Sequence, residues 1–128
     1  MKSVKVKNIG GQAVEIGVTD GMISSIAAID NAHHSVLPGF IDVHNHGAVG
    51  VDVNSASAED LLRVGEFLAS KGVTAWLPTF VPDSDDNYLR TIDAINDAMR
   101  RQVERPIAQI VGVHYEGVFA NEAMCGAL

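Results

Sequence analysis

The sequence predicts a parallel α/β fold for residues 38–128. From Pro38 onward, short and continuously apolar runs, typical of strands buried on both faces, alternate with longer runs that have helical spacing. The resulting order is strand, helix, strand, helix, strand, which in one parallel sheet requires right-handed crossovers. Histidine-containing motifs close the first and third strands. The C-terminal ends of parallel strands are where such folds place their chemistry.

Residues 1–37 are expected to form a separate β-rich segment. Apolar and polar residues alternate over 4–7 and again over 14–18, on either side of a glycine pair. This period of two is typical of half-buried strands. Asp20-Gly21 predicts a tight hairpin turn that leads into a short strand over 22–26.

The first motif, residues 38–47, reads Pro-Gly-Phe-Ile-Asp-Val-His-Asn-His-Gly. On a strand, Asp42, His44 and His46 share one face, because successive side chains point to opposite sides. Two imidazoles at this spacing can converge on one metal ion, each at roughly 2.0–2.1 Å. Asp42 is placed to accept a hydrogen bond from a ligand imidazole and so to fix its tautomer. The alternative is a strand end with two solvated histidines.

Two amphipathic helices are predicted between the strands. Ser57 followed by Asp60 predicts a capped helix start, and Gly72 marks the stop. Asp83-Ser84 predicts the second start and Pro106 the second end. The expected buried positions are Leu61, Val64, Gly65 and Leu68 in the first helix, and Leu89, Ile92, Ile95, Asn96, Met99 and Val103 in the second.

The second motif follows a predicted third strand over 107–113. It reads Gly-Val-His-Tyr-Glu-Gly, and the period of two puts His114 and Glu116 on one face. A glutamate turned toward a protein interior is costly unless it is paired with a cation, so a metal ion is a natural partner for Glu116. A glutamate hydrogen-bonded to backbone is the alternative. His114, one layer deeper, is interpreted as a support for the site or as a satisfied core histidine.

Composition limits the classes of partner. Among the 128 residues, 16 acidic side chains outnumber 9 basic ones, and no basic cluster is long enough to follow a phosphate backbone, so we expect no nucleic-acid partner. The chain has no run of about 18 apolar residues, and its start does not resemble a signal peptide. We therefore expect no membrane partner and a cytoplasmic location. Cys125, the single cysteine, cannot form an internal disulfide.

Three stretches together resemble one enzyme family. His-x-His after Pro-Gly-Phe-Ile-Asp resembles the first barrel strand of the amidohydrolase superfamily. Gly-Val-Thr-Ala-Trp-Leu-Pro-Thr at 72–79 and Gly-Val-His-Tyr-Glu-Gly-Val-Phe-Ala-Asn at 112–121 narrow the resemblance to the N-acetylglucosamine-6-phosphate deacetylase family. It covers essentially the whole chain. The resemblance implies that 38–128 begins a (β/α)8 barrel, preceded by a small β-sandwich segment at 1–37.

The resemblance also implies a reaction, the hydrolysis of N-acetylglucosamine 6-phosphate to glucosamine 6-phosphate and acetate. One or two divalent ions, zinc first and iron or another metal as alternatives, would support it. By similarity, the metal ligands would be His44, His46 and Glu116, and the pocket for the amino-sugar phosphate would include Gly117, Val118 and Ala127.

A closed barrel takes about 250 residues, and this chain reaches Leu128 just after the third strand. The family's catalytic aspartate and remaining histidines come from later strands. We therefore expect no catalytic base within these residues, no activity of the chain alone, and association into a homo-oligomer through its open sheet. Val118 and Leu128 also depart from the proline and polar residue usual in the family, which bears on substrate identity.

Two other functions are kept open. One is a different amidohydrolase that acts on a cyclic amide or an N-acyl amino acid. Many of those enzymes bridge their metals with a lysine from the fourth strand, whereas Glu116 on the third strand favours the sugar enzyme. The other is a catalytically inert chain that assembles with a partner chain.

Overall fold

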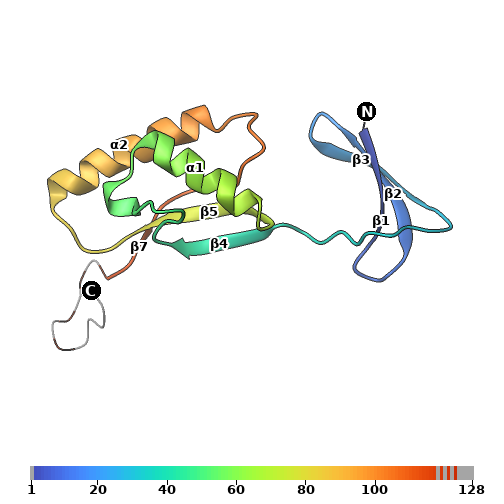
Figure 1. Cartoon of the computed structure of the whole chain (residues 1–128), viewed down its shortest axis with the longest axis horizontal. Coiled ribbons are helices and arrows are strands. Elements are labelled where there is room, and N and C mark those ends of the chain that lie inside the picture. The colour runs from blue at the N-terminus through green and yellow to red at the C-terminus, as the bar shows by residue number, and fades with distance from the viewer. Residues whose placement is uncertain (1, 118, 120, 122, 124–128) are drawn as a thin grey trace. The chain divides into compact units, whose positions relative to one another are not determined.

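The computed structural model describes residues 2–117, 119, 121 and 123. Its contacts divide the chain into two compact units, Met1–Pro38 and Gly39–Leu128 (Figure 1). Within the described residues, no helix is both long enough and apolar enough to cross a membrane.

The N-terminal unit is an antiparallel sheet of β1 (Lys2–Lys7), β2 (Ala13–Thr19) and β3 (Met22–Ala28), with β2 in the middle. The predicted hairpin is confirmed, since Asp20 and Gly21 join β2 to β3 with φ of 51° and 75°.

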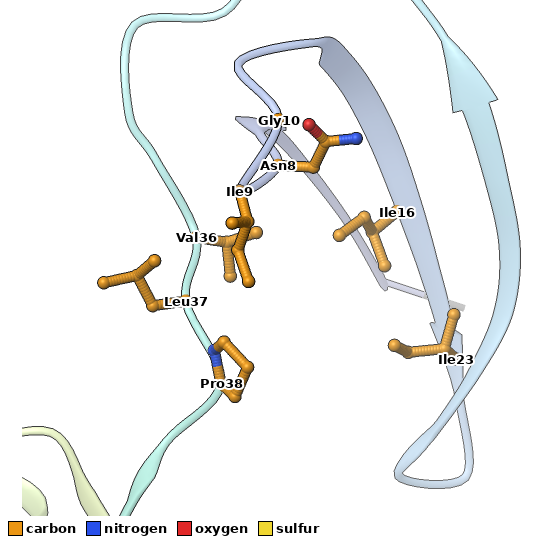
Figure 2. A pocket seen from close by; sticks show the side chains of 8 residues that line it. All are labelled: Asn8, Ile9, Gly10, Ile16, Ile23, Val36, Leu37 and Pro38. Atoms are coloured by element: carbon orange, nitrogen blue, oxygen red, sulfur yellow. The ribbon is translucent and has the colours of Figure 1, made fainter.

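The described residues of this unit form a single antiparallel sheet, and the expected β-sandwich stays a prediction. A sandwich needs a second sheet packed on the apolar face. Here Val4, Ile16 and Ile26 lie side by side across the three strands, and Ile26 is 64% exposed. The segment around Val36 and Leu37 covers part of this face and leaves an open apolar pocket of about 530 Å³ (Figure 2).

The C-terminal unit is a parallel sheet with helices. Its elements in chain order are β4 (Phe40–Asn45), the 3-10 helix η1 (Val53–Ser55), α1 (Ala58–Ala69), β5 (Val73–Phe80), α2 (Asp85–Arg101), β6 (Gln109–Ile110) and β7 (His114–Tyr115). The central strand β5 pairs in parallel with β4 on one side and with β6 and β7 on the other. Both helices lie on one side of this sheet (Figure 1). The predicted parallel α/β order is confirmed, and closure into a barrel stays a prediction.

Helix α1 forms as predicted. Ser57 and Asp60 make a reciprocal capping box, and Gly72 follows the helix with φ of 83°. The predicted face of Leu61, Val64, Gly65 and Leu68 is buried. A Cβ on Gly65 would lie 2.9 Å from the carbonyl oxygen of Ala108, so this position needs glycine for the close approach.

Helix α2 starts at the predicted cap, Ser84, but its buried face is only partly as predicted. Ile95 is buried, whereas Leu89 and Val103 are 63% and 66% exposed and Asn96 is also exposed. The buried positions are Thr91, Ile95 and Ala98, which are spaced for one helix face. Thr91 can occupy a core position because its hydroxyl hydrogen-bonds the carbonyl of Asn54. The helix ends at Arg101, ahead of the proline expected to stop it.

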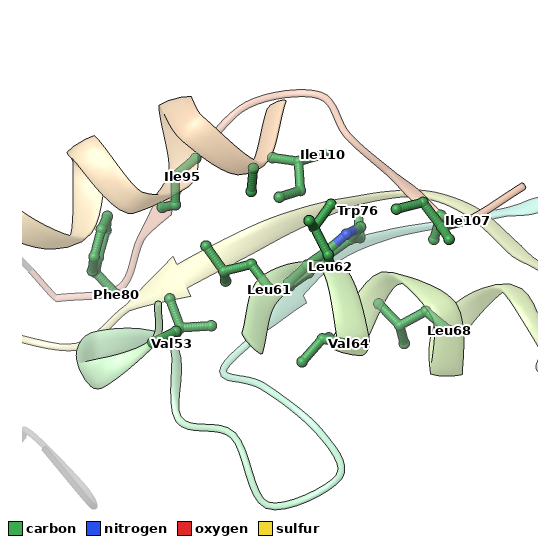
Figure 3. Packing of buried hydrophobic residues seen from close by; sticks show 13 residues of the cluster. Val53, Leu61, Leu62, Val64, Leu68, Trp76, Phe80, Ile95, Ile107 and Ile110 are labelled. Carbon is green, nitrogen blue, oxygen red and sulfur yellow. The ribbon is translucent and has the colours of Figure 1, made fainter. Parts of the chain in front are cut away.

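The hydrophobic core lies between the two helices and β5 (Figure 3). Its larger members are Val53, Leu61, Leu62, Val64, Leu68, Trp76, Phe80, Ile95, Ile107 and Ile110. The strand β4 lies outside this core, and Phe40, Ile41 and Val43 are each about 60% exposed (63%, 65% and 59%). The expectation that every strand is buried on both faces is therefore wrong for β4, since α1 and α2 pack chiefly on β5 and β6.

The third strand is shorter than predicted and is interrupted. Trp76 of β5 pairs with Ile110, and Thr79 of β5 pairs with His114. Between these two pairs the chain moves four positions along the third strand and only three along β5. The carbonyl of Trp76 accepts a hydrogen bond from the amide of Val111. The next residue on that side of β5 is Pro78, which has no amide hydrogen to donate. The ladder therefore breaks at this level and resumes near Phe80, next to the second motif.

Candidate metal centre

The side chains of His44, His46 and Glu116 converge at the C-terminal ends of β4 and β7. Glu116 Oε2 lies 2.8 Å from Nε2 of His46 and 3.3 Å from Nε2 of His44, and the two Nε2 atoms are 3.0 Å apart. In the described part of the chain, these three residues form a group whose ligand atoms all lie within 4.8 Å of one another. All three side chains are partly exposed, so one side of the cluster faces solvent.

The hydrogen bond at the other ring nitrogen of His46 fixes its tautomer. Nδ1 of His46 lies 3.3 Å from the carbonyl oxygen of Thr79, which can only accept, so Nδ1 carries the hydrogen in the neutral ring. Nε2 then presents a lone pair to the carboxylate of Glu116. Two electron-rich atoms at this distance repel each other unless a cation lies between or beside them.

The donor set fits a divalent ion. Two imidazole nitrogens and a carboxylate oxygen are standard zinc ligands, and in a tetrahedral site with bonds of 2.0–2.2 Å such atoms lie roughly 3.4 Å apart. The three distances of the cluster, 2.8, 3.0 and 3.3 Å, are slightly shorter than this. A divalent ion held here would have three protein ligands and an open side, the arrangement typical of catalytic metal centres.

The loop after His46 is held by backbone contacts that require glycine. Gly47 has φ of 124°, and a Cβ there would lie 2.0 Å from the carbonyl oxygen of Val51. The carbonyl of His46 accepts a hydrogen bond from the amide of Val53. Asn54 then ties this loop to the one after β5, because its side chain bonds both the amide and the carbonyl of Val81.

Asp42 lies on the same strand as the two histidines, where its carboxylate bonds neighbours in sequence. Oδ1 accepts from the backbone amide of His44 at 3.2 Å, and Oδ2 accepts from the side chain of Asn45 at 2.8 Å. Asn45 in turn accepts from the amide of Gly47. Asp42 therefore braces the backbone beside the ligands, and a direct bond to an imidazole stays a prediction.

His114 packs against the cluster without joining it. Its ring centroid lies 4.8 Å from that of His44, and its Nδ1 lies 3.3 Å from the hydroxyl of Thr79. The sequence alone predicted no role for Thr79, the last residue of the stretch 72–79. The structure brings its carbonyl to His46 and its hydroxyl to His114. Only the tertiary arrangement could show this, since the three residues come from different strands.

The remaining predicted site residues lie at the end of the chain. Gly117 follows Glu116 with φ of 66°, which turns the backbone away from the strand direction. Val118, Ala127 and Cys125 lie outside the described residues. The residues that line the apolar pocket of the N-terminal unit include no titratable side chain.

Comparison with known proteins gives consistent matches. The chain is 29% identical to N-acetylglucosamine-6-phosphate deacetylase of Lysinibacillus sphaericus, over 99% of this chain and 35% of that protein. The crystal structure of N-acetylglucosamine-6-phosphate deacetylase from Thermotoga maritima superposes with a TM-score of 0.78 at 29% identity. The superposed part is 98% of this chain and 35% of the Thermotoga chain. The chain matches the N-terminal portion of these deacetylases.

Another deacetylase that is similar to this chain is named for a different sugar phosphate. N-acetylgalactosamine-6-phosphate deacetylase of Escherichia coli O157:H7 is 31% identical, over 88% of this chain and 31% of that protein. No protein-family model matches the chain. The chain spans about a third of the length of the curated deacetylases it matches.

Proposed function

We propose that this chain forms the metal-binding N-terminal part of an enzyme that hydrolyses N-acetylglucosamine 6-phosphate to glucosamine 6-phosphate and acetate. The observation that carries the proposal is the convergence of His44, His46 and Glu116, from strands far apart in sequence, in a chain similar over its length to such deacetylases. In this proposal, residues 38–128 begin a (β/α)8 barrel, and Gly117, Val118 and Ala127 line the sugar pocket.

Each ligand has a separate role. His44 and His46 supply neutral nitrogen donors, and Glu116 supplies a negative charge that offsets part of the charge of the ion. A divalent ion held there, zinc in this proposal, would supply a hydroxide nucleophile at neutral pH and polarise the acetyl carbonyl. The open side of the cluster is where water and the acetyl group would meet.

Proton transfer needs a group that we assign outside these residues. A general base must lie within about 3 Å of the attacking water. Glu116 is committed to the cluster, and Asp42 is committed to the backbone of His44 and to Asn45. We propose that the base comes from later strands of the complete barrel. A cytoplasmic location and the lack of nucleic-acid or membrane partners stay predictions from the sequence.

N-acetylgalactosamine 6-phosphate is the second candidate substrate. The relative at 31% identity is named for this sugar, which differs from the first candidate only in the configuration at one carbon. The chemistry at the acetyl group is the same for both sugars. The metal centre therefore does not distinguish them, and the choice depends on the pocket.

The test is acetate release by a fusion of this chain to the remaining part of the Thermotoga maritima deacetylase. With zinc present, the fusion should hydrolyse one or both sugar phosphates, and the unfused chain should not. Glu116→Gln in the fusion should abolish turnover, while Asp93→Asn on the exposed side of α2 should not change it. A folded fusion that hydrolyses only a cyclic amide or an N-acyl amino acid would replace the proposed substrate. A folded fusion with no activity on any of these would contradict the enzymatic proposal.

A further inference from the structure

The hydroxyl of Thr79 touches all three strands that build the metal centre. Thr79 is fully buried at the end of β5. Its Oγ1 accepts a hydrogen bond of 2.9 Å from the backbone amide of Asn45 on β4, and lies 3.3 Å from Nδ1 of His114 on β7. It also lies 3.2 Å from the carbonyl of Leu77, to which it donates. One buried hydroxyl therefore contacts the backbone of β4, the backbone of β5 and the ring of His114.

This hydroxyl lies at the level where the strand pairing of the sheet is irregular. Asn45 is aligned with Pro78 in the pairing of β4 with β5, and the register shifts between Asp42 and Asn45. On the other side of β5, the third strand is interrupted at the same proline. Pro78 has no amide hydrogen to donate toward the third strand. At this level of the sheet, the Thr79 side chain adds a contact to each of the two neighbouring strands.

The two strands joined in this way carry all three proposed ligands. Asn45 lies between His44 and His46 in the chain, so the bond to its amide fixes the backbone from which both imidazoles project. His114 lies two residues before Glu116, so the contact to its ring holds the strand that delivers the carboxylate. The hydroxyl thus contacts both the strand of the imidazole pair and the strand that leads to the carboxylate.

We propose that Thr79 is a positioning residue whose hydroxyl sets the geometry of the metal centre and thereby its affinity for the ion. The inference rests on the metal site of the proposed function and adds a residue that does not bind the metal. Supporting groups of this kind typically contribute about 10–100-fold to metal affinity.

The test compares three variants of the full chain by calorimetry with zinc. Thr79→Val keeps the shape of the side chain and removes the hydroxyl, and should weaken zinc binding about 10-fold or more. Thr79→Ser keeps the hydroxyl and should restore affinity. Thr91→Val is the matched control. Thr91 is equally buried, but it lies on α2, and its hydroxyl donates to the backbone carbonyl of Asn54. This variant should leave zinc affinity unchanged.

A second readout needs no metal. In the metal-free chain, Thr79→Val should shift the nuclear magnetic resonances of the Asn45 amide and of the His114 ring, and Thr79→Ser should return them. If Thr79→Val does not fold, Thr79→Ala removes the same hydroxyl and leaves more room. Equal zinc affinity of the unaltered chain and a folded hydroxyl-free variant would overturn this inference alone. Failure of the unaltered chain to bind zinc would overturn the metal centre and this inference with it.

Discussion

The close contact between His46 and Glu116 can be stabilised by either of two cations, a proton on the ring or a metal ion. With Nδ1 of His46 donating to the carbonyl of Thr79, Nε2 and the carboxylate can be reconciled at 2.8 Å either by a proton on the ring or by a metal ion. The proton gives an ion pair, and the metal gives coordination to both atoms. Protons and metal ions therefore compete for the same space.

Zinc binding by the full chain should depend on both histidines and on pH. The double variant His44→Ala/His46→Ala should lose zinc binding in a calorimetric titration. For the unaltered chain, affinity should fall as the pH is lowered through the range in which histidines take up protons, because a protonated imidazole cannot bind a metal. Affinity should fall, and not rise, on acidification, because protons and zinc compete for the same imidazole nitrogens.

The matched control for this prediction is His33→Ala/His34→Ala. Both of these histidines are exposed in the N-terminal unit and do not belong to the cluster. Their removal should leave zinc affinity unchanged. Equal affinities for the two double variants would contradict the assignment of the metal to His44 and His46.

At the scale of helices and strands, the features that could be predicted are those set by neighbours in sequence. The Ser57–Asp60 capping box and the Asp20-Gly21 turn each depend on residues within a few positions of one another. The exposure of Leu89 could not be predicted, because it depends on which side of α2 meets the core. The interruption of the third strand depends on Pro78, a residue of another strand.

Removal of the α1 cap should destabilise the C-terminal unit. Ser57 Oγ accepts from the amide of Asp60 at 3.2 Å, so Ser57→Ala leaves a helix N-terminal amide without this partner. The expected loss in the free energy of unfolding is about 1 kcal/mol, measured by urea denaturation. Ser55→Ala, which removes a weaker exposed contact of 3.3 Å, should change stability much less.

The loop before α2 should make stability depend on pH in acid. Hydrogen bonds from the side chain of Asn54, then the amide of Ser84 and the side chain of Asn87, hold the pKa of Asp83 below its ordinary value. A carboxyl with a lowered folded pKa stabilises the fold above its unfolded pKa of about 3.9, and this contribution disappears as pH falls through the folded pKa.

The measurement is urea unfolding of the unaltered chain and of Asp83→Asn, near neutral pH and in acid below about pH 4. The unaltered chain should lose more stability on acidification than Asp83→Asn. Asp93→Asn, on the exposed side of α2, should behave like the unaltered chain. Parallel losses in all three proteins would show that Asp83 is not responsible.

At the scale of the whole molecule, the outer strand β4 carries exposed apolar side chains. Ile41 and Val43 project from one side of it and are 65% and 59% exposed, and within the described residues β5 is its one paired neighbour. Apolar side chains beside an open strand edge favour association. The sequence could predict an apolar strand here, but whether it is covered depends on what packs against it.

The isolated chain should therefore self-associate as its concentration rises. Sedimentation should show species larger than a monomer, and Ile41→Asn/Val43→Asn should shift the distribution toward the monomer. Leu89→Asn, which changes a single exposed leucine on α2, should have no such effect. A monomer at every concentration, with no binding of a hydrophobic dye, would count against this prediction.

For the candidate site too, features set by neighbours in sequence could be predicted, and contacts between strands could not. The period of two along a strand was enough to pair His44 with His46 and to single out Glu116, but it could not give the 2.8 Å approach between strands. That approach depends on β5 and on the hydroxyl at its end. The role of Thr79 therefore has no signature in the sequence around it.

The shortness of β7 has a consequence for amide hydrogen exchange at the candidate metal centre. Glu116 is attached to the sheet beside a two-residue strand, through the bond of its amide to the carbonyl of Phe80. Segments held by so few bonds open more readily than a core strand, and their amide hydrogens exchange with solvent faster. An ion that binds only the closed arrangement holds it shut. If zinc binds the cluster, it should therefore slow amide exchange at Tyr115 and Glu116 far more than along β5.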